Sequence, residues 1–186
     1  GYSITTGSSN IAIGANSLKV NSTGSSNTAV GFYALAESTV SNNTAVGYYA
    51  AKVNTTGSGI AALGYRTLVA NTTGDDNTAI GYEALTANTT GSDNTAVGYK
   101  ALYAHTTGSA STALGHQALD NLTTGNYNIG VGVNANGTTT GNGNIGIGND
   151  ALAANTTPNG NIGIGYEAAK ANTTGSATVA LGYQAL

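Results

Sequence analysis

The sequence predicts an all-β protein, a parallel β-solenoid (β-roll) built from coils of about seventeen residues. Three features predict it: a fixed period, a short alternating segment in every period, and a turn phrase that closes each period. We measure the period between the glycines that follow an aliphatic residue, here called marker glycines. Successive marker glycines are seventeen residues apart in eight of the ten intervals and sixteen residues apart in the other two. Such a period is typical of solenoids, whose units pack only against their neighbours. The marker glycines are Gly14, Gly31, Gly47, Gly64, Gly81, Gly98, Gly115, Gly132, Gly148, Gly165 and Gly182.

The residues just before each marker glycine predict a short strand. The nearest is always Val, Ile or Leu, and the next is always Ala or Gly. One face of the strand therefore carries Thr or Ile, an aliphatic residue and then an aromatic one, while the other face is almost bare. We expect the aliphatic residues to stack into an apolar seam. We expect the Ala/Gly face to lie against sister chains, because bulk there would hold two sheets apart.

The rest of each period predicts bends and turns. Asn starts the strand in eight of the eleven units and should form a ladder of side-chain amides at a corner. The segment Tyr-x-Ala-Leu predicts a second strand or a bend. The phrase Asn-Thr-Thr-Gly-Ser predicts a turn, because Asn and Gly tolerate positive φ. Coils spaced by about 4.8 Å would stack into a rod roughly 50 Å long.

A narrow coil rich in Ala and Gly buries little apolar area, which is weak support against chain entropy. We therefore expect a homotrimer. Residues 1–186 are expected to be a single repeat domain, and the chain, which starts at Gly1 and stops within a repeat, a segment of a longer fibre.

Composition excludes several classes of function. Only 7% of the 186 residues are charged, the net charge is −3 and there is no Cys. Without a basic patch we expect no nucleic-acid partner, and without an apolar run of about 20 residues we expect no membrane insertion. The two histidines, His105 and His116, each replace a repeat residue, so we expect no enzyme, no cofactor and no metal site. Asp75, Asp76 and Asp93 are interpreted as solvated turn acids, with weak calcium binding as the alternative.

The strand motif resembles the head repeats of YadA-type trimeric autotransporter adhesins. The residues that carry the resemblance include Asn10-Ile11-Ala12-Ile13-Gly14, Asn27-Thr28-Ala29-Val30-Gly31 and Asn161-Ile162-Gly163-Ile164-Gly165. The resemblance implies a left-handed parallel β-roll that trimerises and binds host matrix or other surfaces. The family's heads commonly use a shorter repeat. The longer phrase of this chain is also similar to repeats of phage tail-fibre and related appendage proteins.

Three sets of side chains are candidates for surface roles. The first set lies one residue after the marker glycine and predicts an aromatic stripe for sugars or proteins, with packing as the alternative interpretation. The second set consists of Asn-x-Thr acceptors for N-glycosylation. Thr pairs in the turns are the third, and suggest ice binding. The aromatic set is Tyr48, Tyr65, Tyr82, Tyr99, Tyr166 and Tyr183; the acceptor set is Asn21, Asn54, Asn71, Asn88, Asn155 and Asn172, with further acceptors at Asn42, Asn121 and Asn136.

These observations predict a structural and adhesive shaft or head segment of an extracellular trimeric fibre. It would act as a stiff spacer and make multivalent surface contacts. The expected partners are copies of the same chain and a host-surface protein or glycan, at a cell surface or on a virion appendage. Two alternatives stay open: a self-assembling extracellular filament or surface-layer component, and an ice-binding solenoid.

Overall fold

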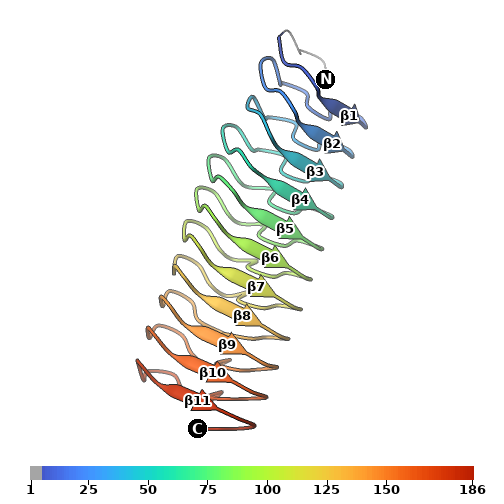
Figure 1. Ribbon diagram of the computed structural model, residues 1–186. Helices are drawn as coiled ribbons and strands as arrows, with labels where there is room; N and C mark the ends of the chain where they lie inside the picture. The colour runs from blue at the N-terminus through green and yellow to red at the C-terminus, as the bar shows by residue number, and fades with distance from the viewer. Residues whose placement is uncertain (1–5) are drawn as a thin grey trace.

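The computed structural model describes residues 6–186 as a slender rod of stacked coils, with the first and last described coils at opposite ends of the rod (Figure 1). Each coil contributes one three-residue strand to a single parallel sheet, in which the strands follow one another in chain order. Residues 6–186 form no helix, and hence none long and apolar enough to cross a bilayer. The strands are β1 (Ile11–Ile13), β2 (Thr28–Val30), β3 (Thr44–Val46), β4 (Ala61–Leu63), β5 (Thr78–Ile80), β6 (Thr95–Val97), β7 (Thr112–Leu114), β8 (Ile129–Val131), β9 (Ile145–Ile147), β10 (Ile162–Ile164) and β11 (Val179–Leu181).

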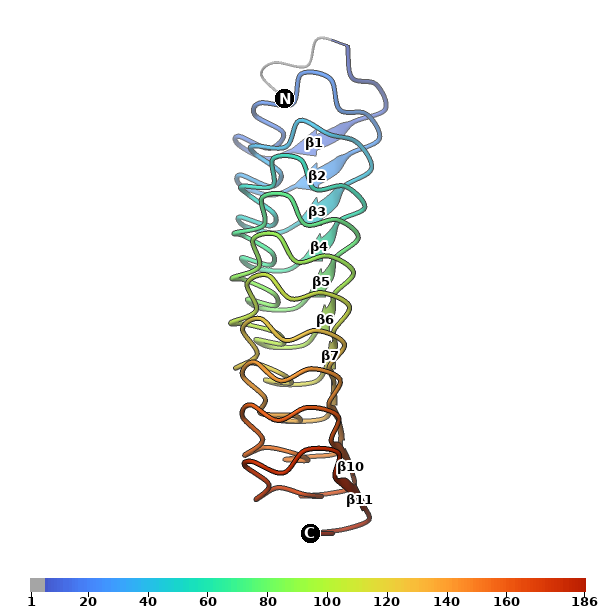
Figure 2. The same cartoon turned by 90° about the vertical axis from the view of Figure 1, so that its left-hand side faces the viewer.

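The period of the sequence is the period of the fold. Ala79 of β5 pairs with Ala96 of β6, one repeat further along the chain, and every other strand pair keeps the same alignment of repeat positions. Turned by 90°, the coils still lie directly above one another (Figure 2). The predicted parallel β-solenoid, with one coil for each repeat of about seventeen residues, is confirmed.

Of the two alternatives expected after the marker glycine, the described coils form the bend and not the second strand, because the backbone there is not extended. In a typical coil Gly98 has φ 137°, Lys100 has φ 52° and Leu102 has φ 51°. A residue in the left-handed region at every second position turns the chain instead of extending it. The marker glycine is also required by packing, since a Cβ on Gly98 would lie 2.2 Å from the carbonyl oxygen of Gly115.

The core lies inside each single coil, and the prediction for the two faces of the strand was wrong. The middle residue of each strand points inward, so Ala79 and Ala96 are fully buried within the chain itself. They pack with leucines from the turning segment, such as Leu85 and Leu102, which are also fully buried. The aliphatic residues expected to form the seam point outward instead. The inner space of so narrow a coil accepts Leu from one side only if the facing strand offers Ala or Gly.

Leucine is the large core residue because of the backbone that carries it. Leu85 and Leu102 both have φ 51°, a conformation in which a β-branched side chain is a genuine outlier. This positive-φ core position, four residues after the marker glycine, therefore holds Leu, Ala or Asn in every coil and never Val, Ile or Thr.

The Asn residue that precedes eight of the eleven strands forms the expected corner, although its partners are backbone groups of the next coil. Asn77 Oδ1 accepts from the Asn94 backbone N–H at 3.0 Å, and Asn77 Nδ2 donates to the Gly91 carbonyl oxygen at 2.7 Å. The side chains of Asn77 and Asn94 are fully buried. One amide thus satisfies two buried backbone groups per coil, which would otherwise be costly.

The closing phrase is a turn, but for a different reason from the one predicted. Its glycine is needed because a Cβ on Gly91 would lie 2.1 Å from the Gly108 carbonyl oxygen. In most Thr pairs the first hydroxyl donates to the next coil, as from Thr89 Oγ1 to the Thr106 carbonyl oxygen at 3.0 Å. The second residue, such as Thr90, is exposed. Only one hydroxyl of the pair is therefore free to face water.

One coil, between Gly132 and Gly148, interrupts this regular core. It is one residue short, and Asn136 occupies the position that Leu holds in neighbouring coils. Asn136 is fully buried, and its Oδ1 atom has no hydrogen-bond partner. The buried apolar residues accordingly separate into one cluster that ends at Leu122 and another that begins at Leu152.

Candidate functional surface

The outward side of the sheet forms one continuous surface along the rod. We call the first and third residues of all eleven strands the sheet face. These positions hold only Thr, Ala, Val, Ile and Leu, and none of them is charged. Their aliphatic side chains are open to solvent: Ile80 is 39% exposed, Leu114 48% and Ile164 39%. An uncharged apolar surface therefore runs along the whole sheet.

The predicted aromatic residues form a ladder beside the sheet face. Tyr48, Tyr65, Tyr82 and Tyr99 stack ring on ring, with centroids 5.4, 5.0 and 5.5 Å apart and planes within 14° of parallel. Phe32 extends this tyrosine ladder at one end and His116 at the other. Tyr166 and Tyr183 form a separate stack with centroids 5.2 Å apart. The two stacks are separated where Val133 and Asn149 take the aromatic position.

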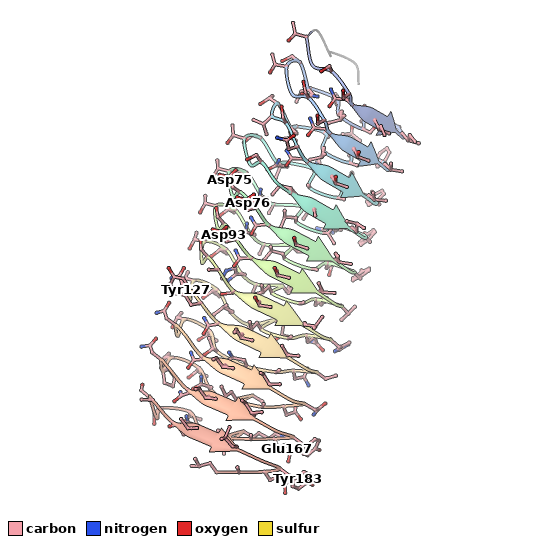
Figure 3. The ribbon with its side chains drawn as sticks, viewed as in Figure 1. Asp75, Asp76, Asp93, Tyr127, Glu167 and Tyr183 are labelled. Carbon is pink, nitrogen blue, oxygen red and sulfur yellow. The ribbon has the colours of Figure 1, made fainter. Side chains whose placement is uncertain are left out.

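The side of the sheet where the strands begin and the side where they end carry different side chains. Tyr183 and Glu167 project from the side where the strands end. Asp75, Asp76 and Asp93 project from the side where the strands begin (Figure 3). The Asp75 carboxylate is already used by the fold, since its Oδ1 accepts from the Ser58 backbone N–H at 2.7 Å. Among residues 6–186 there is no group of three or more His, Cys, Asp or Glu side chains placed to hold a metal ion. Calcium binding at these turns has no geometric support.

The predicted glycosylation acceptors lie mainly inside the coil. Asn21, Asn54, Asn71, Asn88 and Asn155 are fully buried, and Asn172 is half-buried. Asn88 is typical of them, because its Nδ2 donates to Asn71 Oδ1 at 2.8 Å and to the Gly91 carbonyl oxygen at 2.9 Å. A glycan on such a nitrogen has no space in the folded coil. Of the further acceptors, Asn42 and Asn121 are exposed and Asn136 is buried.

His105 occupies a structural position within the coil. It is fully buried at the turn position that Asn holds in other coils, and its Nε2 donates to the Gly108 carbonyl oxygen at 2.8 Å. Its Nδ1 has no partner. Burial lowers the pKa of the His105 imidazole, against the opposing effect of the hydrogen bond to Gly108. The neutral ring is therefore the form that the coil accommodates.

The sequence analysis missed a second group of aromatic residues. Tyr33 and Tyr49 follow the ladder positions in two coils, and their ring centroids lie 5.6 Å apart. Lys52 Nζ lies 5.6 Å from the Tyr33 centroid and 5.0 Å from the Tyr49 centroid. The aromatic pairs Phe32-Tyr33 and Tyr48-Tyr49 were the available signal, because no other coil has adjacent aromatic residues.

Comparison with known proteins adds no assignment to this geometry. No protein-family model, no curated protein and no solved structure matches the chain.

Proposed function

We propose that this chain is a stiff segment of a multichain extracellular fibre, in which the sheet faces of parallel chains pack against one another around a shared axis. The observation that carries the proposal is the exposed, uncharged sheet face. The surface from the first strand residue to the tyrosine ladder is five residues wide, and its coils are about 4.8 Å apart. The sheet face together with the ladder therefore measures on the order of 650 Å². The largest apolar patch of a typical monomer measures about 300–600 Å².

The proposed contact differs from the one predicted from the sequence. The Ala/Gly positions are occupied within the chain, so they are unavailable to a neighbour. The aliphatic residues of the sheet face supply the burial that the narrow coil lacks. Chains that continue along a fibre must run parallel, so the symmetry axis lies along the rod. We favour three chains, because the strand motif resembles that of trimeric adhesin heads. The tyrosine ladder would then lie beside the shared axis, with the turns facing outward.

The adhesive part of the proposal depends on repetition. Each coil presents the same exposed turn position, as at Thr90 and Thr107. Weak contacts repeated along one rigid rod act together, because the first contact raises the effective concentration of the others. A rod of this kind combines the roles of spacer and multivalent binder.

The direct test is the mass of the protein in solution. One chain has a mass of 18.2 kDa, so light scattering after gel filtration should give three times that mass for a trimer. Val97→Lys places a charge in the middle of the sheet face and should convert the trimer to monomer. Thr90→Lys adds the same charge at an exposed turn and should leave the mass unchanged.

Three outcomes would contradict the proposal. A monomeric wild-type chain would remove the shared face altogether. A dimer, with twice the mass of one chain, would keep the face and replace the trimer. Growth without a fixed mass would favour the self-assembling filament.

A further inference from the structure

The cationic side chains of this rod fall into two classes. Lys100 Nζ lies 3.7 Å from Glu83 Oε2, and Lys170 Nζ lies 3.4 Å from Asp150 Oδ2, so both ammonium groups have carboxylate partners. Within residues 6–186, no ion pair involves Lys19, Lys52 or Arg66. The chain has five Lys and Arg residues in all. Its three unpaired cations therefore all lie in the first four coils.

These three cations lie along one line of aromatic rings. Lys19 Nζ lies 6.0 Å from the Tyr33 centroid, and Lys52 Nζ lies over both Tyr33 and Tyr49. Arg66 follows Tyr49 at the same position of the next coil. We call these five residues the basic aromatic strip. Elsewhere the Tyr33 position is polar or charged. Lys100 Nζ also lies 5.5 and 4.9 Å from the Tyr99 and Tyr103 centroids, but it is paired with Glu83, so cations that contact rings without a carboxylate partner are confined to this part of the rod.

Arg66 has unused hydrogen-bonding capacity. Its Nε atom is buried and has no partner. Its positive charge reaches the neighbouring rings, because it opposes the rise in the pKa of the Tyr48 hydroxyl that hydrogen bonding to Tyr49 and burial produce. A guanidinium half-buried beside aromatic rings is suited to bind an anion through the nitrogens that face outward.

The charge of the whole chain is divided along its length. Residues 1–70 carry three cationic side chains and one acidic one, Glu37, whereas residues 71–186 carry two cationic and seven acidic ones. The first part therefore has a formal charge of +2 and the second −5. Glu37 forms no ion pair with the strip in the described part of the chain. An anionic ligand would be attracted to the first four coils and repelled by the rest.

We propose that the basic aromatic strip binds an acidic polysaccharide in which uronate residues alternate with neutral sugars. Lys19 and Lys52 hold the same coil position two coils apart, a separation of about 9.6 Å. A hexose unit is about as long as one coil is thick, so carboxylates on every second sugar match these two ammonium groups. Lys52 lies over both Tyr33 and Tyr49, and Tyr48 stacks on Tyr49, so these half-buried rings offer the sugars between the ammonium groups their exposed edges rather than free faces.

The shape of the strip also favours an extended chain. It follows the axis of the rod across successive coils, so it suits a linear polymer better than a compact ligand. The proposal rests on the adhesive part of the proposed function and does not need the trimer. It identifies the chemistry of the ligand and the coils that contact it.

The test is binding of a hyaluronan decasaccharide, with neutral dextran of similar length as the control. Wild-type protein should bind hyaluronan and not dextran, and the affinity should fall several-fold between about 50 and 300 mM NaCl as exposed charges are screened. Lys52→Gln and Tyr49→Asn should each weaken binding about five-fold, since each removes one charge contact or one ring. Asn suits position 49, because Asn134 holds the same coil position with φ 50°.

Matched controls come from residues 71–186, where the net charge is negative and both lysines have carboxylate partners. Lys100→Gln and Tyr82→Asn should change the affinity less than two-fold. Equal loss in these controls, no binding by wild type, equal binding of dextran, or binding of polyglutamate but not hyaluronan would each overturn the proposal. Light scattering on the same samples separates this result from the assembly question, since a trimer that fails to bind contradicts only the strip. Circular dichroism on each variant shows that the coils are folded.

Discussion

Replacing His105 by Asn should stabilise the rod, because His105 interrupts a buried ladder of turn asparagines. Asn71 Nδ2 donates to Asn54 Oδ1, and Asn88 Nδ2 donates to Asn71 Oδ1, each at 2.8 Å. In the next coil His105 replaces the Asn, and the chain of amide-to-amide hydrogen bonds ends there. Asn88 Oδ1 and His105 Nδ1 are both buried without a partner. An Asn at position 105 would donate to Asn88 Oδ1. Its own Oδ1, which faces Leu122 in the next coil, would accept from the Gly108 backbone N–H, as Asn21 Oδ1 accepts from Gly24 N–H at 2.9 Å.

The magnitude follows from these two unpaired atoms. Each buried polar atom without a partner costs about 1–3 kcal/mol. The smaller Asn leaves some space where the ring was, which offsets part of the gain. We expect His105→Asn to raise the free energy of unfolding by about 2 kcal/mol at pH 7.5.

The gain should increase in acid. Burial lowers the pKa of His105 in the folded chain, whereas in the unfolded chain it is close to 6.5. Below that pH the unfolded state binds a proton that the folded state does not. The wild-type protein therefore loses stability as the pH falls from about 6.5, by at most about 1.4 kcal/mol per pH unit. His105→Asn lacks this loss, so its advantage should grow by about 1 kcal/mol at pH 5.5.

Urea unfolding followed by circular dichroism at pH 7.5 and 5.5 measures both effects. Asn88→Ala, made alone and together with His105→Asn, isolates the new hydrogen bond, since most of the gain at pH 7.5 should disappear without the Asn88 acceptor. A variant no more stable than wild type, or an advantage that does not change with pH, would refute the reasoning.

Three further predictions concern the backbone, the core and the irregular coil. Gly98→Ala should cost about 3 kcal/mol or more in urea unfolding, because its Cβ would lie 2.2 Å from a backbone oxygen; Gly160→Ala should cost only about 1 kcal/mol, because its φ of 68° is unfavourable but nothing lies within 4 Å. Ala96→Leu should unfold the coils rather than merely separate chains, because Ala96 is fully buried inside its own coil; a folded monomer by circular dichroism and light scattering would argue against this. Hydrogen exchange within the regular rod should be fastest at residues 133–150, where Asn136 interrupts the core, and uniform exchange would contradict that.

The sequence predicted the architecture well because the signals were repeated. The spacing of the marker glycines indicated the coil length and the parallel register. The Asn before each strand was correctly placed at a corner, because a polar residue kept at one position of an apolar segment must satisfy buried groups. Even the stacking of Tyr65 on Tyr82 followed from their spacing alone. In a solenoid, residues one repeat apart in the sequence are neighbours in adjacent coils.

The orientation of the strand could not be predicted in the same way. Alternation shows that Thr78 and Ile80 share a face and that Ala79 lies on the other, but it does not show which face points inward. The assumption that aliphatic residues fill the core failed, because the coil is too narrow to hold them on the strand side. The informative residue was Leu85, whose position in the turn with positive φ becomes apparent only from the backbone.

The common register of the strands makes the rod adjustable in length. Because Ala62, Ala79 and Ala96 occupy equivalent places in successive coils, deleting one whole repeat would let the flanking strands pair directly. Each added or lost repeat would change the reach of the rod by about 4.8 Å and leave its cross-section untouched. A deletion of any other length would put side chains where two glycine backbones meet. Genetic changes in steps of one repeat are therefore a route by which such a rod can be lengthened or shortened without redesign.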